Sequence, residues 1–280
     1  MNFKMHTRQV AGPPHYVRIG RSAGLIALGV YVFFLLYGIF FGDHLIFRPP
    51  PSSYRDTGVI SKVMTRKGSI LSMRYLHNPE AAYTILYSHG NAEDLGHIRG
   101  ILEEFHKHGF SIIAYDYSGY GTSSGRPSEN AAYADISAVY DYAVRTIGLP
   151  PEKILLWGRS VGGGLSLDLA VRETVGGLIL ESSFVSAFRV ITTIPLLPAD
   201  KFNNLKKIKG LSCPVLVIHG GQDITVPFWH GKQLYEQAPP PKMRFWVDGA
   251  RHNDVMRRAG KAYWETLRRF TDLLESRPER

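Results

Sequence analysis

The surroundings of Ser160 point most directly to chemistry. Ser160 lies in Gly-Arg-Ser-Val-Gly (158–162), which follows the apolar run ILLW and precedes a segment of helical length. This Gly-x-Ser-x-Gly pattern between a strand and a helix predicts a sharp turn that exposes the serine hydroxyl at the strand end. A serine hydroxyl becomes a nucleophile only beside a general base, and that base needs an orienting carboxylate. A base and an orienting acid are therefore expected in loops that follow later strands.

An acid and a base follow two later apolar runs. Asp223 comes after VLVIH, and His252 comes in the loop after MRFWV. The chain order Ser, Asp, His is the order in which this kind of nucleophile turn is combined with its partners. We therefore predict Ser160 as the nucleophile, His252 as the base and Asp223 as the orienting acid of an acyl-transfer site.

Other residues compete for these roles. Asp248 and Asp254 flank His252 closely in sequence, whereas Asp223 comes from a separate loop and can approach the imidazole from the side. His89 and His219 each precede a glycine at the end of an apolar run. We interpret both histidines as structural or pocket-shaping residues.

The sequence favours chemistry without a metal or an organic cofactor. His106 and His108 are two residues apart on a predicted helix, so their side chains point in different directions. A single cysteine excludes an intramolecular disulfide framework and a cysteine-rich metal cluster.

Two backbone N–H groups are expected to form an oxyanion hole. Val161 directly follows the serine and opens the next helix. The second donor should come from the loop after an earlier strand, and Asn91 follows TILYS-His-Gly in such a loop. An ordinary strand-to-helix turn is the alternative interpretation of that loop.

These residues must be positioned by alternating strands and helices. Apolar runs at 84–88, 111–115, 154–157, 178–180, 215–219 and 244–247 predict strands. Helix-length segments separate them at 98–108, 130–146, 161–173, 229–237 and 257–276. Strands of continuous apolar character separated by helices predict a mostly parallel central sheet with helices on both faces, an α/β fold. In such sheets, binding and catalytic residues lie mainly in the loops that follow the carboxyl ends of the strands.

One segment, residues 182–211, breaks this alternation. Two prolines, Pro195 and Pro198, exclude one regular helix, and the segment is too apolar for a solvated loop. We predict a short cap over the serine that contacts the substrate through Phe184, Phe188, Leu196 and Leu197. The alternative is that these side chains only complete the core.

The N-terminal region is typical of a membrane anchor. No charged side chain occurs from Ser22 to Gly42, and an apolar run of this length can cross a bilayer. A cleaved signal peptide and a buried core helix are the alternatives, but no small-residue cleavage pattern or polar face is present. We therefore predict a basic tail, a transmembrane anchor, a linker and an α/β domain at 1–22, 23–42, 43–58 and 59–280.

Charge is concentrated at the two ends of the chain. Residues 1–22 carry four basic and no acidic groups, whereas residues 43–250 carry 21 basic and 19 acidic groups. This distribution excludes a basic groove for nucleic acid and favours a membrane partner. The positive-inside rule predicts a single-pass protein with a cytoplasmic N-terminus and an extracytoplasmic catalytic domain.

Five segments together carry a resemblance to a known family. They are SHGNAEDLG (88–96), YDYSGYG with SSGRPS (115–121 and 123–128), WGRSVGG (157–163), HGGQDITVP (219–227) and ARHND (250–254). They resemble the α/β-hydrolase superfamily, and within it the membrane-associated α/β-hydrolase-domain serine hydrolases, which include protein depalmitoylases and fungal polarity-related hydrolases. The similarity covers roughly residues 45–275.

The resemblance implies the same residue roles and an activity. It assigns Ser160, Asp223 and His252 to a catalytic triad, and Asn91 and Val161 to the oxyanion hole. It implies hydrolysis of small-molecule or lipid-like carboxylic esters or thioesters through an acyl-enzyme intermediate. The N-terminus lacks the cysteines of the depalmitoylases, which favours a general acyl-ester hydrolase. The alternative function is a non-catalytic α/β-hydrolase scaffold that binds a membrane partner.

Overall fold

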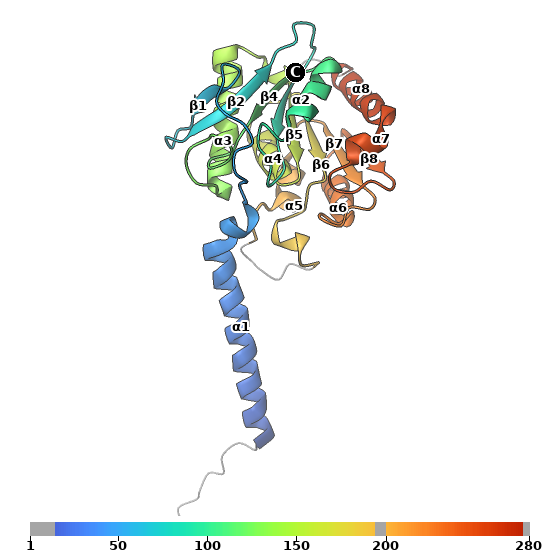
Figure 1. The fold of residues 1–280 in the computed structure, drawn as a ribbon. Coiled ribbons are helices and arrows are strands. Elements are labelled where there is room, and N and C mark those ends of the chain that lie inside the picture. Colours follow the sequence, from blue (N-terminus) through green and yellow to red (C-terminus); the bar gives the residue numbers. More distant parts are fainter. Residues whose placement is uncertain (1–14, 194–199, 277–280) are drawn as a thin grey trace, which may run out of the picture. The chain divides into compact units, whose positions relative to one another are not determined.

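The computed structural model describes residues 15–193 and 200–276 (Figure 1). The chain divides into two units, the first ending at Phe41 and the second beginning at Gly42. The predicted linker, residues 43–58, falls within the second unit together with the sheet.

A long apolar helix makes up most of the first unit. Helix α1 spans His15–Ile46. Its 22 residues Leu25–Ile46 have a mean hydropathy of 2.3 and are long and apolar enough to cross a membrane, by length and composition. The predicted apolar N-terminal helix is thus confirmed, and its use as an anchor stays a prediction.

The second unit is organised around one eight-stranded sheet with the order β1-β2-β4-β3-β5-β6-β7-β8. Its strands are β1 Ser61–Met64, β2 Ile70–Leu76, β3 Thr84–Ser88, β4 Ser111–Tyr115, β5 Ile154–Arg159, β6 Gly177–Glu181, β7 Val215–Gly220 and β8 Lys242–Val247. The pairs β1–β2 and β2–β4 are antiparallel, and every later pair is parallel. The predicted mostly parallel sheet is confirmed.

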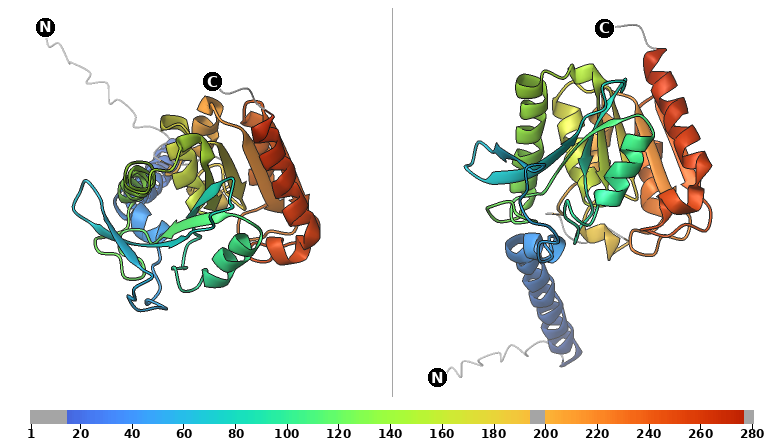
Figure 2. Two further views of the ribbon diagram at one scale, coloured as in Figure 1. Left: turned by 90° about the horizontal axis from the view of Figure 1, so that it is seen from above. Right: turned by 45° about the horizontal axis from the view of Figure 1, so that its top comes forward.

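Helices cover both faces of this sheet, as predicted. They are α2 Arg99–Lys107, α3 Glu129–Tyr142, α4 Gly162–Arg172, α5 Asn204–Lys207, α6 Trp229–Gln237, α7 Val255–Ala259 and α8 Lys261–Glu275. Shorter helical turns occupy Ala143–Ile147, Pro151–Lys153, Phe188–Val190 and Ile208–Gly210. Figure 2 shows α8, in red, on the opposite side of the sheet from α3 and α4, in green and yellow-green.

Two hydrophobic cores follow from this arrangement. Side chains of α3, α4 and α6 pack with one set of strand residues, which includes Leu156 and Val217. Side chains of α2, α7 and α8 pack with the alternate set, which includes Leu155 and Leu216. Consecutive residues of one strand thus enter opposite cores, which explains why the central strands are continuously apolar.

The structure differs from the sequence prediction at both ends of the domain. Strands β1 and β2 were not predicted: β1 is exposed at three of its four positions, and polar Ser72 and Arg74 interrupt the apolar residues of β2. The predicted helix 257–276 is divided at Gly260, whose φ of +53° lies in the left-handed region.

Candidate active site

The turn after β5 holds Ser160 in an unusual backbone conformation. Its φ is +54°, a left-handed value that is costly for a residue with a side chain. The neighbours must be glycine: a Cβ on Gly158 would lie 2.4 Å from Gly163 Cα, and one on Gly162 would lie 2.1 Å from the Ser88 carbonyl oxygen. The Ser160 N–H donates to the Glu181 carbonyl at 2.9 Å. Close packing against β3 and β6 therefore fixes the turn.

Three predicted residues from different strand ends come together here. His252 Nε2 lies 3.1 Å from Ser160 Oγ, and His252 Nδ1 lies 2.7 Å from Asp223 Oδ2. Ser160 follows β5, Asp223 follows β7 and His252 follows β8. A proton can pass from the hydroxyl to the imidazole along this line of contacts, while the carboxylate holds the ring.

The surroundings of Asp223 favour its ionised carboxylate. Its Oδ1 accepts the N–H groups of Thr225 at 2.9 Å and Val226 at 2.8 Å, which leaves Oδ2 for His252. Burial opposes ionisation of the carboxyl, but His252 and the Val226 N–H outweigh it, so the pKa of Asp223 lies below its ordinary value. A carboxylate at this position can stabilise a positively charged imidazole.

The alternative acids and the alternative base are less well placed than Asp223 and His252. Asp254 accepts the Arg251 N–H at 2.6 Å and pairs with Arg257 at 3.1 Å. Asp248 is exposed. His219 lies farther from Asp223 Oδ2, at 3.5 Å, and its Nε2 contacts the Val226 carbonyl at 2.9 Å. Burial also lowers the pKa of His219. Geometry thus singles out Asp223 and His252.

The two predicted oxyanion donors follow neighbouring strands. β3 and β5 are adjacent, with Ser88 opposite Gly158. Val161 directly precedes α4, where the first N–H groups of the helix have no carbonyl partner within it. Asn91 lies in the loop after β3, next to Ala92, whose φ is +56°. The Asn91 loop and the Ser160 turn therefore leave the sheet side by side.

An arginine that sequence reasoning missed connects these loops. Arg159, the last residue of β5, hydrogen-bonds Glu93 and donates to Asn253 Oδ1 at 2.6 Å. Glu93 Oε2 in turn accepts the Gly90 N–H at 2.8 Å. The Arg159 side chain is 7% exposed. Burial alone would lower the pKa of Arg159, but Tyr87, Glu93 and Glu181 together raise it above its ordinary value.

The signal for this connection was present but not interpreted. Arg159, Glu93 and Asn253 all lie within the segments given above that carry the family resemblance, each one or two residues from a predicted site residue. Since a motif gives no contact between loops, the ion pair could not be predicted from it.

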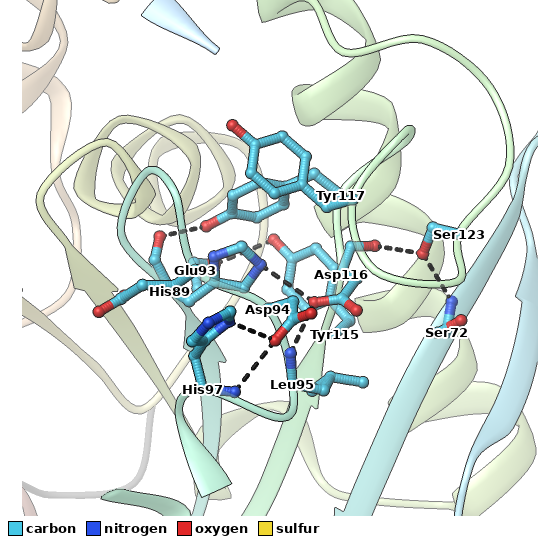
Figure 3. Close-up of polar contacts among 12 residues, drawn as sticks. Ser72, His89, Glu93, Asp94, Leu95, His97, Tyr115, Asp116, Tyr117 and Ser123 are labelled. Carbon is cyan, nitrogen blue, oxygen red and sulfur yellow. Dashed lines mark hydrogen bonds and ion pairs between the residues drawn. The ribbon is translucent and has the colours of Figure 1, made fainter. Parts of the chain in front are cut away.

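A polar network supports the base of the loop after β3 (Figure 3). The Tyr117 hydroxyl donates to the His89 carbonyl at 2.5 Å, and the two rings stack with centroids 4.2 Å apart. Asp116 Oδ1 accepts the Leu95 N–H at 2.9 Å, and Asp94 Oδ1 lies 2.7 Å from His97 Nδ1. His89 therefore has structural partners, in keeping with its interpretation from the sequence.

The predicted cap residues separate into distinct environments. Phe184 is buried in the core, 6.3 Å from Phe202 between ring centroids. Phe188 begins a short helical turn and is half-buried. Leu196 and Leu197 lie outside the described residues. Within the described part of the chain, no group of three or more His, Cys, Asp or Glu side chains is arranged to hold a metal ion.

Comparison with known proteins identifies similar chains. The family model Hydrolase_4, described as serine aminopeptidase S33, matches residues 79–205. The alpha/beta hydrolase domain-containing protein aho-3 of Caenorhabditis elegans is 43% identical over 198 residues, which are 70% of this chain and 59% of that protein. The alpha/beta hydrolase domain-containing protein 17B of Homo sapiens is 40% identical over 225 residues, which are 78% of this chain and 77% of that protein.

Solved structures show the same fold. The esterase PF2001 of Pyrococcus furiosus superimposes with a TM-score of 0.69 at 16% identity, covering 82% of this chain and 98% of that one. The esterase RhEst1 of Rhodococcus sp. ECU1013 gives a TM-score of 0.62 at 18% identity, covering 78% of this chain and 99% of that one. At these identities the similarity extends to the fold alone.

Proposed function

This chain belongs to the family of α/β-hydrolase domain-containing proteins, and we propose that it is a membrane-anchored serine hydrolase of carboxylic esters or thioesters. One observation carries the proposal: the unbroken line of hydrogen-bonding atoms from Ser160 Oγ through His252 to Asp223, with spacings of 3.1 and 2.7 Å. Together these side chains provide the nucleophile, the base and the orienting acid that acyl transfer requires.

The proposed reaction has two halves. His252 takes the proton of Ser160 as Oγ attacks the carbonyl carbon of the substrate, and Asp223 stabilises the resulting imidazolium. The backbone N–H groups of Asn91 and Val161 stabilise the negative charge on the carbonyl oxygen. The alcohol or thiol then leaves with the proton from His252, and water attacks the acyl-enzyme with His252 again acting as base. The bond between the acyl group and Ser160 Oγ breaks, the carboxylic acid leaves, and His252 returns the proton to Ser160.

The sequence after β6 supports an acyl substrate. Residues 182–211, which follow the carboxyl end of β6, are rich in apolar residues, and a buried acyl chain contributes about 0.8 kcal/mol for each methylene. We propose that Phe188 contacts this chain, since it is only half-buried, whereas Phe184 packs in the core.

The proposed topology places α1 across a membrane with the N-terminus in the cytoplasm. Lys4, Arg8, Arg18 and Arg21 precede the apolar span without any acidic residue among residues 1–22. Protease protection of a C-terminal epitope tag in sealed vesicles tests the orientation. Protection from protease added on the cytoplasmic side supports an extracytoplasmic domain, and digestion there contradicts it.

A substrate panel tests the proposed activity. The full-length chain in detergent is assayed with p-nitrophenyl esters of increasing acyl length, an acyl thioester and an aminoacyl p-nitroanilide, with Ser160→Ala as the matched control. We expect turnover of esters or thioesters that Ser160→Ala abolishes. Turnover of the anilide alone would assign a peptidase, and no turnover in any arm would favour a scaffold.

A further inference from the structure

The side chain of Asn91 binds the segment with which the second unit begins, ahead of the sheet in the chain. Its Oδ1 accepts the Arg48 N–H at 3.0 Å, and its Nδ2 donates to the Ile46 carbonyl. We call residues 43–48, which include the last residues of α1, the helix-end segment. We call the loop between β3 and α2, residues 89–98, the oxyanion loop. We propose that the helix-end segment is part of the catalytic apparatus: it positions the oxyanion loop through the side chain of Asn91.

Asn91 Oδ1 is a shared acceptor that fixes several groups at once. In addition to Arg48, the Tyr120 hydroxyl donates to it at 2.7 Å and the Ala92 N–H donates at 3.0 Å. The Arg48 N–H also lies 3.0 Å from the Tyr120 hydroxyl. These contacts join the helix-end segment, the oxyanion loop and the turn after β4 around one amide group.

The helix-end segment is itself firmly held by the domain. Phe47 is 3% exposed and packs against Tyr120 and Phe202, with ring centroids 6.4 and 5.9 Å away. Asp43 Oδ1 accepts the Lys201 ammonium at 2.8 Å and the Glu129 N–H at 3.0 Å. The segment therefore provides Asn91 with a fixed partner.

The oxyanion loop requires such a partner because its backbone is strained. Ala92 has a φ of +56°, a conformation that persists in a residue with a side chain only where its surroundings impose it. The donor in the proposed reaction is the backbone N–H of Asn91, and an oxyanion donor works only at a well-defined distance. Asn91 thus has two separate tasks: its N–H meets the substrate, and its side chain holds that N–H in place.

The chain just beyond the helix-end segment binds the same loop. The Ser53 N–H donates to Asp94 Oδ2 at 2.7 Å. The Tyr54 hydroxyl donates at 2.5 Å to Asp116 Oδ2, which follows β4 and whose Oδ1 accepts the Leu95 N–H of the loop. A Cβ on Gly96 would lie 2.2 Å from Ser53 Oγ, so the two segments are in close contact. Residues 46–53 therefore contact the oxyanion loop at Asn91, Asp94 and Gly96.

Asn91→Ala tests this proposal, which rests on the proposed hydrolase activity. The substitution keeps the backbone N–H and removes only the side-chain contacts. In the full-length chain in detergent, with p-nitrophenyl butyrate as the probe, we expect kcat to fall about tenfold to a hundredfold with KM within about twofold. Tyr120→Phe removes one donor to Asn91 Oδ1 and should lower kcat by a smaller factor. It tests the same contact if Asn91→Ala fails to fold.

Phe47→Leu and Phe270→Leu form a matched pair of core substitutions. Phe270 is fully buried on α8 and packs against Gly177, at the amino end of β6, whereas the oxyanion loop leaves the carboxyl end of β3. We expect only Phe47→Leu to lower kcat, and we expect no further loss when it is combined with Asn91→Ala, because both act through one contact. Equal kcat values for the pair, or an unchanged kcat in Asn91→Ala, would overturn the inference. Absence of turnover in the unsubstituted chain would instead contradict the proposed hydrolase activity itself.

Discussion

The two sides of the candidate site are held in different ways. On the acid–base side, Ser160, Asp223 and His252 each follow a strand of the parallel part of the sheet, and short contacts join them directly. On the oxyanion side, Asn91 lies in a loop with a strained neighbour and is held by residues 46 and 48. The proposed reacting groups are positioned by the sheet, whereas the proposed oxyanion loop is hydrogen-bonded to the chain that leaves α1.

The acid–base side should show the largest effect. Asp223→Asn keeps the shape of the side chain but stabilises the wrong imidazole tautomer, so we expect kcat for an ester to fall about 10⁴-fold. Asp248→Asn is the matched control, because Asp248 is exposed and should leave kcat unchanged. A normal rate in Asp223→Asn together with a loss in Asp248→Asn would show that the wrong acid is assigned.

Arg159 connects the two sides, so its substitution should weaken both. We expect Arg159→Met to lower kcat about tenfold to a hundredfold, and to lower the free energy of unfolding by about 3 kcal/mol because Glu93 loses its partner. Arg159→Lys keeps the charge but cannot donate to Glu93 and Asn253 together. Compared with Arg159→Met, Arg159→Lys should restore more of the free energy of unfolding, measured in urea, than of kcat. Full restoration of both would show that only the positive charge of Arg159 matters.

The cap residues should show a smaller, selective effect. Phe184→Ala removes a core side chain and should destabilise the domain by about 3–5 kcal/mol with unchanged relative rates across an ester series. Phe188→Ala should leave the Tm nearly unchanged but shift the preferred acyl length, about fourfold in kcat/KM for each methylene affected. The reverse pattern would place Phe184 at the substrate and Phe188 in the core.

The pH dependence of stability should show the smallest effect. Because the pKa of Asp223 is lowered in the folded protein, its ionised form contributes stability above the unfolded value of 3.8, and this is lost as the pH falls through the folded pKa. Asp223→Asn should therefore flatten the acid limb of a plot of Tm against pH. An acid limb as steep as that of the unsubstituted chain would contradict the assigned shift.

The sequence predicted the parallel sheet because its strands are buried on both faces. Leu155 and Leu156 enter opposite cores, so the run is continuously apolar and easily recognised. Ser160, Asp223 and His252 could be proposed as a set because each lies in a short motif directly after such a run. The turn around Ser160 requires glycines at fixed positions, so its geometry is expressed locally in the sequence.

The oxyanion side could not be predicted to the same depth. Asn91 was proposed from its loop, but its side-chain partners are the backbone groups of Ile46 and Arg48, which carry no residue-specific signal. Residues 43–58 were predicted as a linker because PPPSSY is polar and stiff, and this composition does not reveal that Phe47 is buried. Contacts between backbone and a distant side chain appear only once the chain is folded.

Active-site labelling tests the central claim most directly. The full-length chain in detergent is treated with a fluorophosphonate, and the modified residue is identified by mass spectrometry, with Ser160→Ala and His252→Ala as controls. An activated serine hydroxyl attacks phosphorus, so we predict a single adduct on Ser160 that is absent in Ser160→Ala and strongly reduced in His252→Ala. Labelling that persists undiminished in Ser160→Ala, or no labelling of a chain that hydrolyses esters, would contradict the assignment of Ser160 as the nucleophile.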